Sequence, residues 1–213
     1  MFIALEGIDG SGKGVQLGYL KDWLNEQGFK VTYARDPGDT PLGESIRSLL
    51  LSQTNYSICP LAEAGLFMSA RAQLVNDVIL PALNEGRIVL VDRFILSTIA
   101  YQGYANSLSS QDIDRLWKAC LFFSGEIFPD ITVLLDCPPA VSHKRLTRPK
   151  DRIESRDQAY HARVLEGYRQ AIQNWNKLAH GESFSIDSTG EPLLVFEQIK
   201  EILQPRLKTL RNA

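Results

Sequence analysis

The chain has 213 residues, of which 44% are hydrophobic and 23% charged, and its formal net charge is −2 at pH 7. This is the composition of an ordinary globular protein, and the length suits one domain covering residues 1–213. The slightly acidic balance disfavours binding to nucleic acid through a globally basic surface, and no apolar run approaches the ~20 residues of a membrane-spanning helix.

Short apolar runs alternate with helical patterns along the chain. The runs that predict strands are 2–6, 31–34, 88–91, 131–135 and 184–186. Helical spacing of apolar residues follows the first run as far as Gly28 and recurs at 46–50, 62–83, 113–121, 140–146, 160–178 and 196–203. Because the runs are continuously apolar rather than alternating, they are typical of parallel strands buried on both faces. The sequence predicts an α/β fold, a parallel sheet of about five strands with helices on both faces.

A glycine-rich loop stands between the first predicted strand and the following helix. Residues 7–14 read Gly-Ile-Asp-Gly-Ser-Gly-Lys-Gly and match the phosphate-loop pattern G-x-x-x-x-G-K-[ST] except at the last position. Such glycines let backbone N–H groups surround an anion, and Lys13 adds positive charge for terminal phosphates. A dinucleotide fingerprint fails because Val15 stands where its third small residue belongs. We therefore expect ATP to bind to the loop: Gly7, Ile8, Asp9, Gly10, Ser11, Gly12, Lys13 and Gly14.

Gly14 occupies the position where most phosphate loops carry Ser or Thr. That hydroxyl normally coordinates Mg²⁺, which glycine cannot do. Mg²⁺ arriving with ATP would rely on phosphate oxygens, water and a carboxylate, and Asp92 at the end of the third strand is the candidate, acting through water. Because this hydroxyl is missing, a nucleotide-binding protein with impaired catalysis stays open as an alternative function.

Polar residues gather where the predicted strands end. Gly7, Asp36, Asp92 and Asp136 all fall at or just past a strand end. Parallel sheets bind ligands at the carboxyl ends of their strands. The chemistry should therefore collect along one edge of the sheet.

Four further segments, at 36–44, 66–73, 92–103 and 151–154, resemble those of thymidylate kinases in order and spacing. The resemblance runs from Phe2 to about Tyr168. It implies a P-loop nucleoside monophosphate kinase that transfers the γ-phosphoryl group of ATP to dTMP, with Mg²⁺, as a cytoplasmic homodimer. The three widely spaced cysteines also predict reduced thiols in the cytoplasm. A kinase for another nucleoside monophosphate remains an alternative.

The resemblance assigns residues to the phosphate and sugar of dTMP. It places Arg47 and Arg93 at the phosphate and Asp9 at the sugar 3′-hydroxyl. Positive charge around the transferred group is what phosphoryl transfer requires. Tyr101 would lie against the deoxyribose, where it disfavours a 2′-hydroxyl.

The resemblance also assigns a base pocket. Phe67 and Arg71 share one helix face at i, i+4, and in the family the matching pair stacks on thymine and hydrogen-bonds its edge. Ser97, Thr98 and Gln102 would lie near thymine, although on their own they indicate no more than a polar helix face. The expected substrate-binding residues are Asp9, Pro37, Arg47, Phe67, Arg71, Arg93, Ser97, Thr98, Tyr101 and Gln102.

Residues 142–156 form a basic run, with six Lys or Arg against Asp151 and Glu154, a net charge of +4. Such runs are usually solvated faces. Here the position matches the lid of the family, which closes over ATP. Members without arginine in the phosphate loop usually carry a catalytic arginine in the lid, and Arg148 and Arg152 are the candidates. The expected catalytic residues are Asp9, Lys13, Arg93, Arg148 and Arg152.

Overall fold

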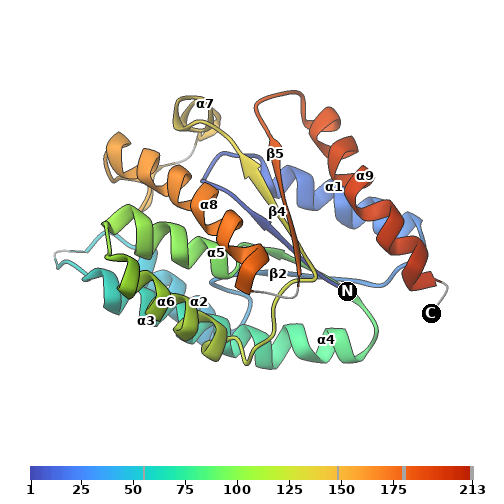
Figure 1. The fold of residues 1–213 in the computed structure, drawn as a ribbon, viewed down its shortest axis with the longest axis horizontal. Coiled ribbons are helices and arrows are strands. Elements are labelled where there is room, and N and C mark those ends of the chain that lie inside the picture. The colour runs from blue at the N-terminus through green and yellow to red at the C-terminus, as the bar shows by residue number, and fades with distance from the viewer. Residues whose placement is uncertain (55, 148, 179–180, 212–213) are drawn as a thin grey trace.

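The computed structural model describes residues 1–54, 56–147, 149–178 and 181–211. Its centre is a sheet of five strands in the order β2-β3-β1-β4-β5, and every neighbouring pair is parallel (Figure 1). The strands are β1 (Phe2–Glu6), β2 (Val31–Arg35), β3 (Ile88–Asp92), β4 (Ile131–Asp136) and β5 (Glu182–Asp187). The predicted α/β fold with a parallel sheet is therefore confirmed.

Helices cover both faces of this sheet (Figure 1). On one face, α1 (Lys13–Glu26) and α9 (Pro192–Arg211) pack against each other and bury Leu20, Leu24 and Ile199 with strand side chains. The remaining helices are α2 (Pro41–Leu51), α3 (Pro60–Leu74), η1 (Val75–Ile79), α4 (Leu80–Asn84), α5 (Ile95–Thr98), η2 (Ile99–Gly103), η3 (Tyr104–Asn106), α6 (Ser110–Phe123), α7 (Pro139–Arg145) and α8 (Gln158–Leu178). Helices α3, α5, α6 and α8 share the core cluster of the second face with the strands.

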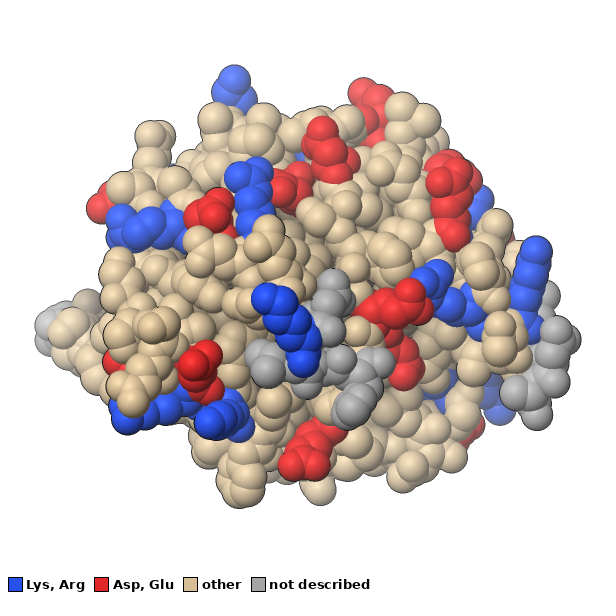
Figure 2. Space-filling view, viewed as in Figure 1, with Lys and Arg blue, Asp and Glu red and all other residues tan. Residues whose placement is uncertain are grey.

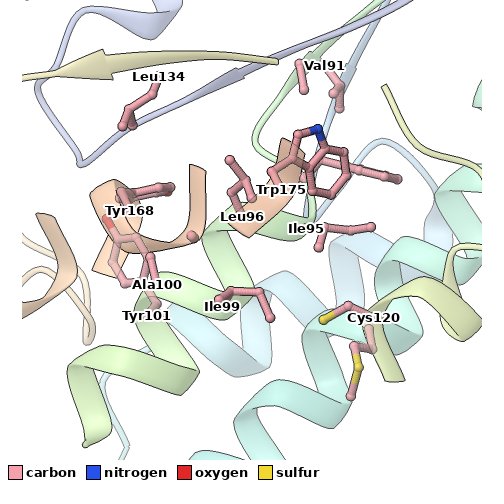
Figure 3. Close-up of a cluster of buried hydrophobic side chains, with 14 of the residues drawn as sticks. Val91, Ile95, Leu96, Ile99, Ala100, Tyr101, Cys120, Leu134, Tyr168 and Trp175 are labelled. Carbon is pink, nitrogen blue, oxygen red and sulfur yellow. The ribbon is translucent and has the colours of Figure 1, made fainter. Parts of the chain in front are cut away.

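The core on this second face holds α8 against the sheet. Figure 3 shows Trp175 and Tyr168 of α8 in the same cluster as Leu134 of β4 and Leu96 of α5. All four side chains are at most 1% exposed. Burial of one large apolar side chain stabilises a fold by roughly 1.5–3 kcal/mol. This packing fixes the inner face of α8, including the Tyr168 hydroxyl.

Two helices contain a π-helical turn that the sequence pattern did not predict. The single helix predicted for 62–83 is α3, η1 and α4 in continuous succession, and η2 likewise continues α5. Pro81 lies two residues beyond η1 and has no N–H for a regular helical hydrogen bond, which a widened turn accommodates. The turn at η2 shapes the segment that carries Tyr101 and Gln102.

On the face shown in Figure 2, basic and acidic side chains are interspersed. Within the described ranges, no helix combines the length and the apolar composition of a membrane span.

Candidate active site

The phosphate loop connects β1 to α1 at the carboxyl edge of the sheet. Gly10 and Gly12 have φ values of +80° and +100°, a region that side chains disfavour. A Cβ at Gly10 would lie 2.3 Å from the Ser142 carbonyl oxygen. The loop therefore packs closely against α7, which only glycine permits at this point.

Lys13 is buried at the start of α1. Its Nζ donates hydrogen bonds to the carbonyl oxygens of Gly7 and Ile8, at 3.0 and 3.1 Å. Burial lowers the pKa of Lys13, and Arg93 lowers it further against the opposing effect of Asp92 and Asp9. The ammonium group thus lies at the inner wall of the loop among charged neighbours.

Asp9 of the phosphate loop forms an ion pair with Arg93. Arg93 Nη2 donates to Asp9 Oδ1 at 2.8 Å, and the Tyr101 hydroxyl donates to Asp9 Oδ2 at 3.2 Å. Burial alone would raise the pKa of Asp9, but Arg93 and Lys13 hold it well below its usual range. Arg93 itself has φ +69°, an uncommon backbone conformation for a residue with a side chain. Asp9 is therefore a fixed carboxylate, oriented by a cation and a phenol.

Beneath this pair lies Glu6, which the sequence analysis did not identify. Glu6 is fully buried and accepts hydrogen bonds from the Phe94 N–H at 2.9 Å and the Ser97 hydroxyl at 2.6 Å. Burial raises the pKa of Glu6 despite these hydrogen bonds. Tyr168 completes the arrangement, because its hydroxyl contacts Ser97 at 2.7 Å and accepts from Arg93 Nη1 at 2.8 Å. In the sequence, the signal that could have identified Glu6 was its place as an acidic residue at the end of an otherwise apolar strand.

A pocket opens beside the loop, with an empty volume of about 540 Å³ that includes its opening to solvent. All ten residues expected to bind substrate line it. Four other residues of the lining were not among those expected to bind substrate: Asp36, Leu51, Asp151 and Ile153. The structure thus brings together residues that are up to 144 positions apart in sequence, Asp9 and Ile153.

A buried ion pair forms the floor of this pocket. Arg71 Nε donates to Asp36 Oδ2 at 2.5 Å, and both side chains are 1% exposed. Arg71 Nη2 also donates to the Phe94 carbonyl and to Thr98 Oγ1. In the described part of the chain, Arg71 Nη1 is buried without a hydrogen-bond partner. Arg71 thus brings a buried guanidinium group to the pocket that Phe67 also lines.

A second cation, Arg47 of α2, lines the pocket near Arg93. Its Nη1 donates to the Pro37 carbonyl at 3.0 Å. Burial lowers the pKa of Arg47, and the positive charges of Arg35 and Arg93 lower it further against the opposing effect of Glu44. An anion bound here would relieve that repulsion.

The basic run at 142–156 divides into α7 and a segment that packs on other helices. Arg152 Nη2 donates to Glu63 Oε2 at 2.5 Å and its Nε to the Leu50 carbonyl at 2.7 Å. Arg156 also donates to Glu63, at 2.9 Å. Arg152 is absent from the described lining of the pocket, and Arg148 lies outside the described residues. The catalytic role of either arginine remains a prediction.

A second concavity adjoins the other side of the phosphate loop, and the sequence analysis missed it. Ser11, Gly12 and Val15 line it together with Arg145 of α7 and residues 188–192, which are the connection after β5 and the first residue of α9. Arg145 donates to the carbonyl oxygens of Ser188 and Thr189 at 2.9 and 3.0 Å. No local pattern marks this site, because it depends on β5 lying at the same sheet edge as the loop.

The residues near the loop fit a Mg²⁺ ion that is held largely by phosphate and water. Among the described residues, Asp92 Oδ1 is a buried acceptor without a hydrogen-bond partner. These described residues include no cluster of three or more His, Cys, Asp or Glu side chains that could hold a metal ion. Mg²⁺ commonly uses one or two carboxylates with substrate phosphates and water. Gly14 is exposed, and a Cβ built there meets nothing within 4 Å.

Comparisons with known proteins agree over the length of the chain. The sequence model of the family described as thymidylate kinase matches residues 5–199. A thymidylate kinase of Thermosipho melanesiensis is 41% identical over 208 residues, which cover 97% of this chain and 99% of that protein. Those of Thermoanaerobacter sp. (strain X514) and Bacillus velezensis are 37% and 35% identical, over 97% and 99% of this chain and 98% of each relative.

Proposed function

The chain belongs to the thymidylate kinase family, and on that premise we propose that it transfers the γ-phosphoryl group of ATP to dTMP between the phosphate loop and the adjoining pocket. The enzyme is a phosphotransferase that converts dTMP to dTDP. The observation that carries the proposed location is the pocket itself. Its lining joins Asp9 of the loop to Arg93, Phe67 and Arg71, so the acceptor would lie next to the donor phosphates.

We assign the phosphates to backbone amides and cations. The loop at 7–14 would cradle the ATP phosphates, with Lys13 neutralising the terminal ones. Arg93 and Arg47, which line the pocket together, would bind the dTMP phosphate. Asp9, held as a carboxylate by Arg93 and Tyr101, would accept a hydrogen bond from the 3′-hydroxyl. These contacts position the acceptor oxygen for transfer, which is most of what this reaction asks of a protein.

The base would lie between Phe67 and the polar side chains of α5 and η2. Phe67 supplies a stacking surface, and the guanidinium group of Arg71, which also lines the pocket, would donate to a base carbonyl. Tyr101, whose hydroxyl is held by Asp9, would close the sugar end against a 2′-hydroxyl. Pro37, Ser97, Thr98 and Gln102 complete the lining.

On the donor side, Asp92 would hold Mg²⁺ through water. Mg²⁺ arriving with ATP would supply positive charge against the negative charge that develops on the phosphates during transfer. The concavity lined by Arg145 and residues 188–192 would take the adenine, whose exocyclic amine could meet backbone carbonyl oxygens. The lid at 142–156 would bring Arg148 or Arg152 to the phosphates and exclude water.

We also propose a cytoplasmic homodimer. Exposed apolar side chains occur on three helices of one flank, at Leu49 of α2, Leu61 of α3 and Phe122 of α6, with α3 packed against the other two. These helices are the proposed contact with a second copy of the chain. The three free cysteines fit a reducing compartment. Sedimentation of the purified protein would report its mass, and a monomer at all concentrations would contradict the dimer.

The test of the proposed function is an assay that couples ADP release to an indicator, with dTMP, dUMP, dCMP and dGMP as acceptors. We expect turnover to be fastest with dTMP. Faster turnover with another monophosphate would instead favour a kinase of different acceptor specificity. ATP binding without transfer at saturating Mg²⁺ would favour the impaired nucleotide-binding protein that Gly14 leaves open.

A further inference from the structure

We propose that Glu63 is a positioning residue for recognition of the base, because it fixes the amide of Gln102 with the oxygen facing the pocket. The inference rests on the proposed function. It adds a residue that affects base recognition by orienting Gln102, without contacting the base itself. It concerns which nucleobase edge the pocket accepts. Glu63 does not itself line the described pocket.

The hydrogen bonds of Glu63 allow the side-chain amide of Gln102 only one orientation. Glu63 is 0% exposed, and its Oε1 accepts from Gln102 Nε2 at 2.9 Å. Its Oε2 accepts from Arg152 at 2.5 Å and from Arg156 at 2.9 Å. A carboxylate paired with two guanidinium groups can only accept hydrogen bonds, so Gln102 must turn its NH₂ group toward it. Amide orientation is assigned from such networks, and this network allows only one assignment.

The amide oxygen of Gln102 is left for a ligand. Gln102 lines the pocket, and among the described residues its Oε1 takes part in none of the hydrogen bonds found. The amide oxygen, the acceptor of this side chain, is therefore free, whereas the NH₂ group is engaged by Glu63. Arg71, whose guanidinium group carries only N–H donors, lines the same pocket.

An acceptor beside a donor matches the edge of thymine and mismatches the edge of cytosine. Thymine presents an N3–H donor next to the O4 acceptor. Cytosine presents an N3 acceptor next to an amino donor, so both positions are reversed. An amide that could rotate would pair with either base, whereas a locked amide leaves an unpaired polar group against cytosine. Glu63 would thus contribute discrimination at N3 without touching the base.

The competing explanation is that Glu63 only ties residues 151–156 to α3. In that case its replacement would lower stability, but it would leave the choice between bases unchanged. The test therefore compares two ligands that share phosphate, sugar and the 5-methyl group, namely dTMP and 5-methyl-dCMP. Their dissociation constants are measured by titration calorimetry with the full chain, and circular dichroism monitors folding.

Glu63→Gln is the decisive variant, because a carboxamide at position 63 can donate or accept and would release Gln102. We expect the preference for dTMP over 5-methyl-dCMP to fall about tenfold, the effect of roughly one hydrogen bond. Glu63→Asp keeps an acceptor-only group, so the preference should be retained even if stability falls. Glu85→Gln, which changes an exposed acid paired with Arg87, is the matched control and should alter neither value.

A double-mutant cycle distinguishes a role of Glu63 in orienting Gln102 from a purely structural role. Gln102→Ala should lower the preference, and adding Glu63→Gln should then change it no further. An unchanged preference in folded Glu63→Gln, or the same drop with and without Gln102, would overturn the proposal. If Glu63→Gln fails to fold, an unchanged preference in Gln102→Ala overturns it. Wild-type protein that does not bind dTMP would instead contradict the proposed function, whereas normal dTMP turnover with an unchanged preference contradicts the role of Glu63 alone.

Discussion

The acceptor pocket and the donor side of the site are built differently. In the pocket, two of the cations are held by side chains from distant elements: Arg93 by Asp9 and Tyr168, and Arg71 by Asp36 and Thr98. On the donor side, Lys13 contacts only carbonyl oxygens of its own loop in the hydrogen bonds described. The acceptor pocket is therefore arranged by the folded chain, whereas the donor side is to be completed by ATP and the lid.

This difference has a physical consequence for catalysis. Contacts that exist before substrate arrives lower the entropic cost of binding and act on affinity. Contacts formed only when ATP is bound and the lid is closed strengthen toward the transition state and act on rate. Substitutions on the two sides should therefore separate into effects on kcat and effects on dTMP affinity.

The largest effect is expected for Lys13→Ala on the donor side. Loss of one charge-assisted contact to the terminal phosphates should raise the barrier by about 3 kcal/mol or more, at least a 100-fold fall in kcat. The dTMP dissociation constant should change little. Lys21→Ala, an exposed lysine on the same helix, is the control for loss of charge. Near-normal kcat in folded Lys13→Ala would contradict the assignment of residues 7–14 as a phosphate-binding loop.

The lid arginines should differ from each other. Arg148→Ala should lower kcat on the order of tenfold or more and leave dTMP affinity unchanged, since its contacts would form only with ATP present. Arg152→Ala should alter dTMP affinity as well, because Arg152 holds Glu63. Single-turnover rates and dTMP titrations on both variants make the distinction. If both keep full kcat, the basic run is a solvated face.

Phe67→Ala should act on the acceptor side alone. Stacking of a base on an aromatic ring is worth roughly 1–3 kcal/mol, so dTMP should bind about 5- to 150-fold more weakly and ATP as before. Phe196→Ala, which removes a buried aromatic ring from the opposite face of the sheet, should lower Tm without changing dTMP affinity. Equal losses for both ligands in Phe67→Ala would make Phe67 a core residue.

The smallest effect is expected for Gly14→Thr. The added hydroxyl should lower the Mg²⁺ concentration that gives half-maximal rate, because it supplies the metal ligand that glycine lacks. The position is open, and threonine is the better helix former by a few tenths of a kcal/mol, so stability should be kept. A Mg²⁺ titration of dTDP formation at fixed total ATP measures this. An unchanged midpoint would mean that coordination is complete by another route.

The two sides also differ in how well the sequence predicted them. Buried parallel strands leave a local signature, and the ten residues that the resemblance to thymidylate kinases assigned to substrate binding all line the pocket. The partners that orient those residues, such as Asp36 for Arg71 and Glu63 for Gln102, depend on tertiary contacts between segments far apart in sequence. The concavity at 188–192 was missed for the same reason, since sheet order alone brings that loop to the phosphate loop.

The pre-arrangement of the acceptor pocket can be tested with one pair of titrations. The dissociation constant of dTMP is measured by calorimetry with and without a non-hydrolysable ATP analogue and Mg²⁺. We expect dTMP to bind in both cases, with affinities within a few-fold of each other, because the groups that hold it are already fixed by the chain. Binding of dTMP only when the ATP analogue is present would contradict this account.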